Sequence, residues 1–250
     1  MKIIGVGDLV TDFYYENDKL IGLDGGMTSH NIIVNLAHLK YNTKVIGARG
    51  DDTAGKLAED SLKSLNVDIS NINIVDYATR CFHVSFVKIK GKYSFTSKKR
   101  CPVCQEKKWY DGSKLDIDKT IKNINKEDIV IFDNLNDINI KIIEKLNNNI
   151  IMLDLGQYFE FENLSDQELL DKLNYNYTII QLNNRVSNYL LKRYNINENE
   201  LFTIIKSKLI VITKGENGGN FYYNDKLVNV RPSKIIEETD PTGAGDAHFA

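Results

Sequence analysis

The last eleven residues of the chain, DPTGAGDAHFA (240–250), combine small residues with an acid in a pattern that can bind an anion. The run Gly243-Ala244-Gly245 directly precedes Asp246. Small residues let successive backbone N–H groups converge on one point, and a helix that starts there adds the positive end of its dipole. Asp246 beside such an anion hole could accept a proton from an alcohol while a phosphoryl group is transferred. A plain glycine turn before a helix-initiating acid explains the same residues equally well.

A second candidate site is a pair of cysteines, Cys101 and Cys104, in the basic stretch KKRCPVCQEKKWY. A C-x-x-C pair resembles half of a zinc knuckle, and Cys81 and His83 could supply the other two ligands. One pair with scattered partners is weak evidence, so reduced cysteines in a polar loop are the favoured interpretation. Zinc, if bound, would stiffen this region without taking part in chemistry.

Apolar runs alternate with amphipathic stretches along most of the chain, and this alternation predicts an α/β fold with a mostly parallel sheet. Helices are expected behind a Ser29 cap and behind a Thr53 cap. Right-handed crossovers would place helices on both faces of the sheet. The expected strands are 2–7, 43–48, 128–132, 149–155, 177–182 and 207–213.

One region departs from this pattern. Residues 78–95 alternate with period two and contain Lys90-Gly91, which predicts a half-exposed antiparallel hairpin. Together with the stretch that begins near residue 10, it would form a small sheet beside the main one. We therefore expect a single domain over 1–250 with a lid, built from about 10–28 and 78–110, that closes over a ligand cleft.

Composition excludes several classes of protein. The 250 residues carry 32 basic and 34 acidic side chains, so the chain lacks the basic excess typical of nucleic-acid binding. The N-terminal apolar run is too short for a signal peptide or a membrane helix. Three cysteines do not indicate a disulfide framework. We expect a cytoplasmic protein without nucleic-acid or membrane partners.

Two stretches resemble the signatures of the PfkB (ribokinase-like) carbohydrate kinases. Residues 240–250 resemble the D-T-G-A-G-D-A-F signature, and 25–56 (GGMTSHNIIVNLAHLKYNTKVIGARGDDTAGK) resemble the signature that begins with G-G and ends with G-D-D-x-x-G. They occur in the expected order, about 200 residues apart, which is far more specific than either alone. The resemblance implies a ribokinase-like three-layer α/β/α sandwich with a mostly parallel central sheet and a small β-sheet lid.

The resemblance also implies roles for individual residues. Asp246 matches the catalytic base, and Gly243, Ala244 and Gly245 match the anion hole. The positions that match sugar contacts are Asp12, Gly25, Gly26 and Asn31. The positions that match nucleotide contacts are Thr213, Gly215, Gly218 and Asn183. No residue is assigned to a metal, and Asp240 matches an acid near the family's monovalent-cation loop.

Each of these residues also has a local explanation. Asp12 can be a solvated hairpin residue, Gly25-Gly26 a turn between strand and helix, Asn31 a residue of a first helical turn, and Thr213 a strand end. Their joint placement at junctions that one sheet edge can bring together favours a site. The implied cofactors are ATP and Mg²⁺, with K⁺ as a further candidate. The implied partners are ATP and a sugar or sugar-like substrate. The exposed β edges of the lid also predict a homodimer, because such edges invite pairing.

Three features depart from the family pattern. Val186 occupies the position of the acid in the family's N-x-x-E motif, which leaves magnesium positioning open. Pro241 and His248 replace the usual threonine and aromatic residue. Family chains typically continue some tens of residues past the Gly-Ala-Gly-Asp run, so we expect a C-terminally shortened kinase. The alternative is a protein that binds a sugar or nucleotide, or has a regulatory role, without turnover.

Overall fold

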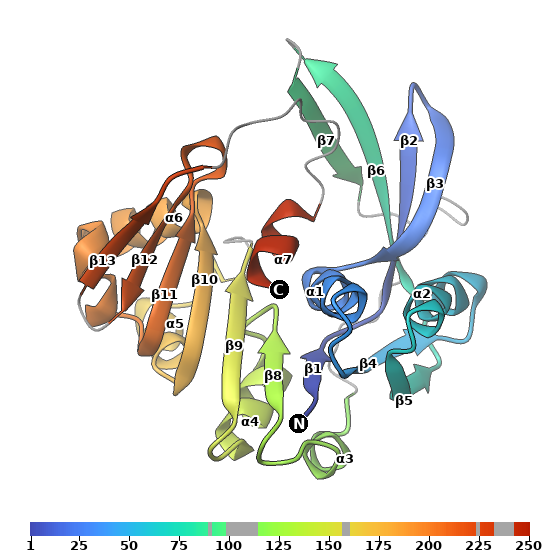
Figure 1. The fold of residues 1–250 in the computed structure, drawn as a ribbon, viewed down its shortest axis with the longest axis horizontal. Coiled ribbons are helices and arrows are strands. Elements are labelled where there is room, and N and C mark those ends of the chain that lie inside the picture. Colours follow the sequence, from blue (N-terminus) through green and yellow to red (C-terminus); the bar gives the residue numbers. More distant parts are fainter. Residues whose placement is uncertain (90–91, 99–114, 157–160, 224–225, 233–242) are drawn as a thin grey trace.

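The computed structural model describes residues 1–89, 92–98, 115–156, 161–223, 226–232 and 243–250. A nine-stranded sheet in the order β13-β12-β11-β10-β9-β8-β1-β4-β5 forms the middle layer (Figure 1). Its strands are β1 Ile3–Val6, β4 Thr43–Gly50, β5 Asp68–Val75, β8 Ile129–Phe132, β9 Ile150–Leu155, β10 Tyr177–Asn183, β11 Ser207–Thr213, β12 Gly219–Tyr223 and β13 Lys226–Val230.

Helices pack on both faces of this sheet and give the fold three layers (Figure 1). One face packs against α3 Ile117–Lys122, α4 Asp137–Lys145, α5 Asp166–Leu173 and α6 Asn184–Tyr194. The other packs against α1 Thr28–His38, α2 Thr53–Ser64 and α7 Ala244–Phe249. Two short 3-10 segments, Glu198–Thr203 and Gly215–Asn217, adjoin the sheet. The three-layer α/β architecture expected from the sequence is confirmed.

The strand order creates a place where a ligand can bind. Strands β5, β4, β1, β8, β9, β10 and β11 are mutually parallel, whereas β12 and β13 run antiparallel. Strand β1 pairs with both β4 and β8, so the chain builds the sheet outward in opposite directions from β1. In open α/β sheets, ligands bind beyond the carboxyl ends of the strands at such a switch point.

A smaller sheet stands beside the main one, at the upper right of Figure 1. It has the order β3-β2-β6-β7. The strands are β2 Val10–Glu16, β3 Lys19–Gly26, β6 Arg80–Ile89 and β7 Lys92–Lys98. The expected hairpin is present as the antiparallel pair β6 and β7, and β2 pairs with β6 in parallel. That this sheet closes over a ligand stays a prediction.

Asp52 fixes the small sheet to the main layer. Its side chain accepts hydrogen bonds from the backbone N–H of Thr79 at 2.7 Å and from that of Gly55 at 2.7 Å, and it caps α2. The cap of α2 is therefore Asp52, and the prediction of Thr53 was wrong. The Ser29 prediction was also wrong, because α1 begins after Met27 without a side-chain cap. Asp52 thus joins the start of β6 to the start of α2.

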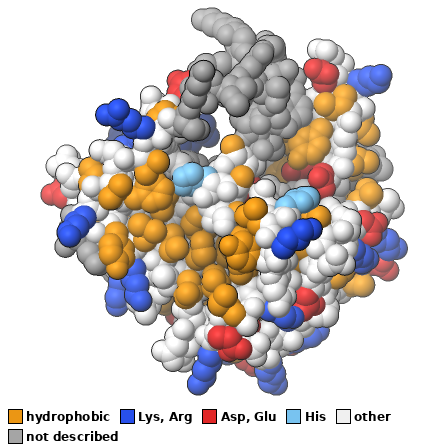
Figure 2. Space-filling view, in the orientation of Figure 1, with side chains coloured by type: hydrophobic (Ala, Val, Ile, Leu, Met, Phe, Trp, Pro, Cys, Tyr) orange, Lys and Arg blue, Asp and Glu red, His pale blue; other side chains and the backbone are white. Residues whose placement is uncertain are grey.

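One part of the main sheet presents apolar side chains to the surface. The register places Tyr223, Leu209, Ile179 and Met152 side by side on one face of four neighbouring strands. Tyr223 is 54% exposed on this face. The apolar patch near the middle of Figure 2 lies over these strands. On the same side of the sheet, helices α1 and α2 pack over β1, β4 and β5. No described helix is long and apolar enough to cross a membrane.

Candidate active site

The site centres on α7, which lies between α1 and the carboxyl ends of β9 and β10 in Figure 1. Gly243 precedes the helix with a φ of 73°, in the left-handed region that glycine adopts at low cost. The Ala247 N–H donates to the carbonyl of Gly243 at 2.8 Å and closes the first turn. This turn places Ala244 and Gly245 at the start of the helix with Asp246 one residue further.

Asp246 is held by α1, which lies in the other family signature, residues 25–56. Asn31 of α1 donates its Nδ2 hydrogen to Oδ2 of Asp246 at 2.7 Å, although 215 positions separate the two residues. Burial raises the pKa of Asp246 to about 6, the Asn31 and Thr28 hydrogen bonds lower it, and Asp133 raises it. A carboxyl group with a pKa near 6 is ionised at neutral pH and remains close to the value that favours proton transfer.

Asp12 lies on β2 and is 9% exposed. Burial raises its pKa to about 6, the Tyr14 hydroxyl lowers it, and Asp24 and Asp246 raise it further. Asp24 is the cross-strand partner of Asp12 in the β2–β3 pair. The Oδ1 atom of Asp12 is buried and has no hydrogen-bond partner in the described structure. A buried acceptor without a partner is costly, and a polar group of a ligand would satisfy it.

Gly25 and Gly26 are required by space. A Cβ atom at Gly26 would lie 2.3 Å from Oδ2 of Asp12, and one at Gly25 would lie 2.3 Å from Nε2 of His30. His30 in turn contacts the Ser61 hydroxyl at 2.9 Å. The two glycines therefore let the end of β3 approach Asp12 and α1 closely. We call Asp12, Gly25, Gly26 and Asn31 the acceptor cluster, after the role that the resemblance implies.

Two buried acids that the sequence analysis missed complete this region. Asp133 directly follows β8 and accepts hydrogen bonds from the Ser29 backbone N–H at 3.2 Å and the Asn134 side chain at 2.7 Å. Burial raises its pKa. Asp154 lies near the end of β9, and burial, with Asp246 next, raises its pKa to about 8. Both acids come at the end of an apolar strand, and that position is the signal that could have found them.

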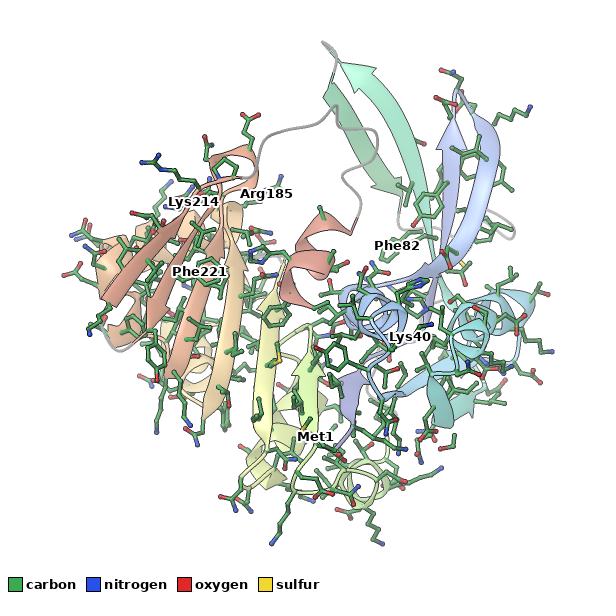
Figure 3. All side chains as sticks on the ribbon, in the orientation of Figure 1. Met1, Lys40, Phe82, Arg185, Lys214 and Phe221 are labelled. Atoms are coloured by element: carbon green, nitrogen blue, oxygen red, sulfur yellow. The ribbon has the colours of Figure 1, made fainter. Side chains whose placement is uncertain are left out.

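The predicted nucleotide residues lie on the other side of α7. Thr213 ends β11, and a tight turn follows in which the Lys214 N–H donates to the Gly218 carbonyl at 2.7 Å. Gly215 and Gly218 have φ values of 56° and 83°. Figure 3 shows Lys214 and Phe221 on this side of the molecule and Phe82 on the small sheet. We call residues 213–218 the nucleotide turn, again after the implied role.

Asn183 has a structural task at the start of α6. Its Oδ1 accepts the Val186 N–H at 2.9 Å and its Nδ2 donates to the Gly156 carbonyl at 2.6 Å. Val186 is fully buried in the hydrophobic core. An acid introduced at Val186 would be buried among apolar side chains, where an unpaired charge is strongly unfavourable. Valine fits this apolar surrounding. Replacing Val186 with glutamate would disturb the core, so that substitution is not a clean test of whether an acid restores activity.

The metal predictions rest largely on residues outside the described part. Cys101, Cys104 and Asp240 all lie there. Cys81 is described and buried, and its thiol donates to the Thr79 carbonyl at 3.4 Å. Among the described residues, no group of three or more His, Cys, Asp or Glu side chains is arranged to hold a metal ion. Zinc and K⁺ therefore stay predictions.

Comparison with known protein families shows which family this chain belongs to. The sequence model of the pfkB family carbohydrate kinases matches residues 25–250, which is most of the chain. The chain belongs to the pfkB carbohydrate kinase family. A comparison with curated protein sequences gives no match. The suspected family is thus confirmed, and the pfkB signatures lie on α1 and α7, the two elements that the Asn31–Asp246 hydrogen bond joins.

Solved structures similar to this pfkB chain include an archaeal member of the ribokinase family and two fructokinases. A nucleoside kinase from Methanocaldococcus jannaschii has a TM-score of 0.73 at 21% identity, with 98% of this chain and 81% of that chain covered. A fructokinase from Xylella fastidiosa with bound ATP has a TM-score of 0.77 at 18% identity, covering 98% and 78%. A double-mutant fructokinase from Vibrio cholerae, with fructose, ADP and a potassium ion bound, has a TM-score of 0.77 at 17% identity, covering 98% and 80%. At these identities the likeness shows the fold.

Proposed function

We propose that this protein transfers the γ-phosphoryl group of ATP to a hydroxyl group, most favourably a hydroxymethyl, of a sugar or sugar-like molecule. The observation that carries the proposal is the placement of Asp246. It lies at the start of α7 beside Gly243 to Gly245, is held by Asn31, and has a pKa raised to about 6. A base beside a group of converging N–H donors is the arrangement that phosphoryl transfer to an alcohol requires.

In this proposal Asp246 accepts the hydroxyl proton as the hydroxyl oxygen forms its bond to the γ-phosphorus. The bond from that phosphorus to the oxygen bridging the β- and γ-phosphates breaks, and ADP leaves with the electron pair. Backbone N–H groups of Gly243, Ala244 and Gly245 stabilise charge on the transferring group. A positioned base contributes roughly 10²- to 10⁴-fold to the rate.

The acceptor cluster supports a polyhydroxylated substrate. Asp12 has a buried Oδ1 atom without a partner, and a substrate hydroxyl can donate to it. Asn31 already binds Asp246, so it would hold the base and the substrate in one geometry. The similar structures include a fructokinase and a nucleoside kinase, whose names indicate acceptors that contain a sugar.

ATP would extend from the anion hole toward the nucleotide turn. The turn exposes backbone groups and leaves the space at Gly215 open, since no heavy atom lies within 4 Å of a Cβ built there. Mg²⁺ is commonly held by one or two carboxylates, water and substrate phosphates rather than by a cage of protein ligands. In this proposal the Mg²⁺ ion arrives with ATP.

The test is phosphorylation of a panel of sugars, nucleosides and amino-sugar conjugates with ATP, Mg²⁺ and K⁺, with product detected by mass spectrometry. Wild type, Asp246→Asn and Asp118→Asn would be compared, because the Asp118 side chain is 77% exposed on α3 and provides a matched control. We expect product from wild type and Asp118→Asn and a loss of roughly 10²-fold or more in Asp246→Asn. Equal turnover in all three variants would contradict the proposal.

The second candidate function is binding without turnover, and Val186 favours it. The acid that the family often carries is replaced there by a buried valine. A folded wild-type protein that binds ATP and a sugar in calorimetry but makes no product with any member of the panel would support the binder and exclude the kinase.

We propose a homodimer formed through the small sheet. Strand β3 is an edge strand, and its Leu20, Ile21 and Leu23 are 44%, 54% and 44% exposed. Exposed edges with apolar side chains invite strand pairing. Sedimentation of wild type and Ile21→Lys tests the proposal, because a charge on the edge should shift a dimer to monomer. A monomeric wild type at micromolar concentration would contradict it.

A further inference from the structure

Gln181 is a buried amide beneath α7 that neither family signature contains. It lies on β10, is 2% exposed, and points toward the face of the sheet that carries α7. Its Nε2 donates to the Gly245 carbonyl at 3.1 Å and to Oδ2 of Asp154 at 3.0 Å. Its Oε1 lies 2.9 Å from Nδ1 of His248. One amide therefore contacts two residues of α7.

The orientation of this amide follows from its partners. The Gly245 carbonyl can only accept a hydrogen bond, so the atom that faces it must be the NH₂ group of Gln181. The oxygen of Gln181 then faces His248, whose Nδ1 must carry the hydrogen. The contacts thus fix one tautomer of His248, and the ring also lies 5.8 Å from that of Phe221.

These contacts hold a helix that has little stability by itself. Helix α7 has six residues, and an isolated helix of that length is marginal in water. Asn31 binds α7 through Asp246 from one side, while Gln181 binds it through Gly245 and His248 from the other. Phe249 packs into the core with α1. Together with the Thr28 hydrogen bond to Asp246, the two amides set how the helix is rotated and placed.

We propose that Gln181 is a positioning residue for phosphoryl transfer, which keeps Gly245 and Asp246 aligned with the reacting groups by fixing α7 to β10. This inference rests on the proposed function and adds a residue to it. Gln181 touches Gly245 through its carbonyl, on the side of the peptide chain opposite the N–H groups of the anion hole. Loss of the contact would let α7 rotate and move those N–H groups and the base together.

Asp154 is the third partner of the Gln181 side chain, and it is a titratable group. It accepts from the same Nε2 that binds Gly245, and Asp246 is the largest charged contributor to its raised pKa. A raised pKa favours the protonated form of Asp154, which adds no charge beside the base. A glutamate at position 181 would place a carboxylate there and remove the donor to Gly245, while leaving an acceptor for His248.

The experiment compares wild type, Gln181→Met, Gln181→Glu and a matched control, Gln167→Met. Gln167 is exposed on α5 and bonds only to Asp171 in the described structure, so its loss should leave the site unchanged. Three quantities would be measured: the ¹⁵N shifts of the His248 ring, the exchange rates of the Ala247 and Ala250 amides, and kcat and KM. A His248→Asn variant assigns the His248 signals among the four histidines.

We expect His248 to carry its hydrogen on Nδ1 in wild type and Gln167→Met and to lose that preference in Gln181→Met. The Ala247 and Ala250 amides, which close α7, should exchange about tenfold faster in Gln181→Met, because the variant loses both hydrogen bonds that Gln181 makes with this helix. The kcat should fall about tenfold or more while KM for the acceptor changes less than about threefold. Gln181→Glu should keep the His248 tautomer and still lose kcat.

The measurements distinguish a failure of the Gln181 proposal from a failure of the proposed kinase function. If no variant, wild type included, phosphorylates any acceptor, the proposed function fails and the His248 and exchange data still decide whether Gln181 fixes α7. If Gln181→Met matches Gln167→Met in tautomer, exchange and kcat, Gln181 does not position α7. A change in KM alone would also overturn the inference.

Discussion

The two sides of α7 use glycine for different physical reasons. In the acceptor cluster, Gly26 leaves room for a neighbour, because a Cβ atom there would lie 2.3 Å from the Asp12 carboxylate. In the nucleotide turn, Gly215 has no heavy atom within 4 Å of a built Cβ and instead has a φ of 56°. Close packing therefore requires glycine in the acceptor cluster, and the backbone conformation of a surface turn requires it in the nucleotide turn.

This difference extends beyond the glycines. Asp12, Asn31 and Asp246 are buried or half-buried, and they lie on β2, α1 and α7. The nucleotide turn lies next to β12 and β13, whose outer face carries exposed apolar side chains such as Val228, at 57% exposure. We infer that the acceptor side is organised before any ligand binds, and that the nucleotide side depends more on what binds to it.

The strongest test of this contrast is Gly26→Ala. The added methyl group must displace the Asp12 carboxylate, so we expect acceptor affinity to fall roughly 10²-fold, as for a displacement of about 1 Å in a positioned group. ATP affinity should stay within about twofold of wild type. Titration calorimetry with each ligand measures both affinities.

The matched control for that variant is Gly22→Ala on the same strand. A Cβ at Gly22 would meet Tyr14 at 3.7 Å, which is an ordinary contact. If Gly22→Ala and Gly26→Ala lose the same acceptor affinity, space around Asp12 is not what the glycine provides, and the contrast between the two sides breaks down.

A smaller effect is expected from the buried acids. The pKa of Asp154 is raised to about 8, so its contribution to the free energy of unfolding is fully present below its unfolded pKa and is lost as pH rises through 8. Asp12 and Asp246 lose theirs as pH rises through about 6. Between pH 6 and 8 the decline in the free energy of unfolding should therefore come mainly from Asp154. Its slope is about 1.4 kcal/mol per pH unit where Asp154 is protonated in the folded protein and ionised in the unfolded one.

Urea denaturation of wild type and Asp154→Asn at several pH values measures this contribution. The variant should show a decline between pH 6 and 8 that is smaller by at least about 1 kcal/mol. Asp171→Asn, on the exposed side of α5, is the control and should follow wild type. Parallel curves for wild type and Asp154→Asn would show that Asp154 is ionised throughout this range.

The smallest effect concerns the nucleotide turn. Gly215→Ala places a side chain at a φ of 56°, which costs about 1 to 2 kcal/mol for a residue with a Cβ. Gly156→Ala is the control, because nothing lies within 4 Å there and its φ is not positive. Denaturation should show the loss in Gly215→Ala only, with weaker ATP binding and unchanged acceptor binding. A loss of acceptor binding in Gly215→Ala would show that the nucleotide turn and the acceptor cluster are not independent, and it would contradict the contrast.

The sequence predicted the parts of this molecule that follow strong local patterns. Continuous apolar runs marked β1, β4 and β8 to β11, and period-two alternation marked β6 and β7. Strand β5 was missed because polar residues interrupt its apolar ones and its register to β4 shifts. Strand β13 was missed because it is exposed along its whole length, and β12 was missed because its short run GNFYY begins with glycine and asparagine and has no long apolar stretch.

The candidate site shows the same limit. Two signatures located Asp246 and Asn31, but not the hydrogen bond that joins them across 215 positions. Asp133, Asp154 and Gln181 were missed because the role of a polar residue in an apolar strand, or directly after one, depends on which element packs against it. Only the fold shows that α7 lies there. Ser29 was taken for a cap although its backbone N–H binds Asp133.

The central claim is that Asp246 accepts the proton while Asp12 holds the acceptor. The most direct test is to measure kcat and KM for the best acceptor with wild type, Asp12→Asn and Asp246→Asn at neutral pH. We predict that Asp246→Asn lowers kcat roughly 10²- to 10⁴-fold with little change in KM, and that Asp12→Asn chiefly raises KM. A wild-type kcat in Asp246→Asn, with kcat lost in Asp12→Asn at unchanged KM, would contradict the account.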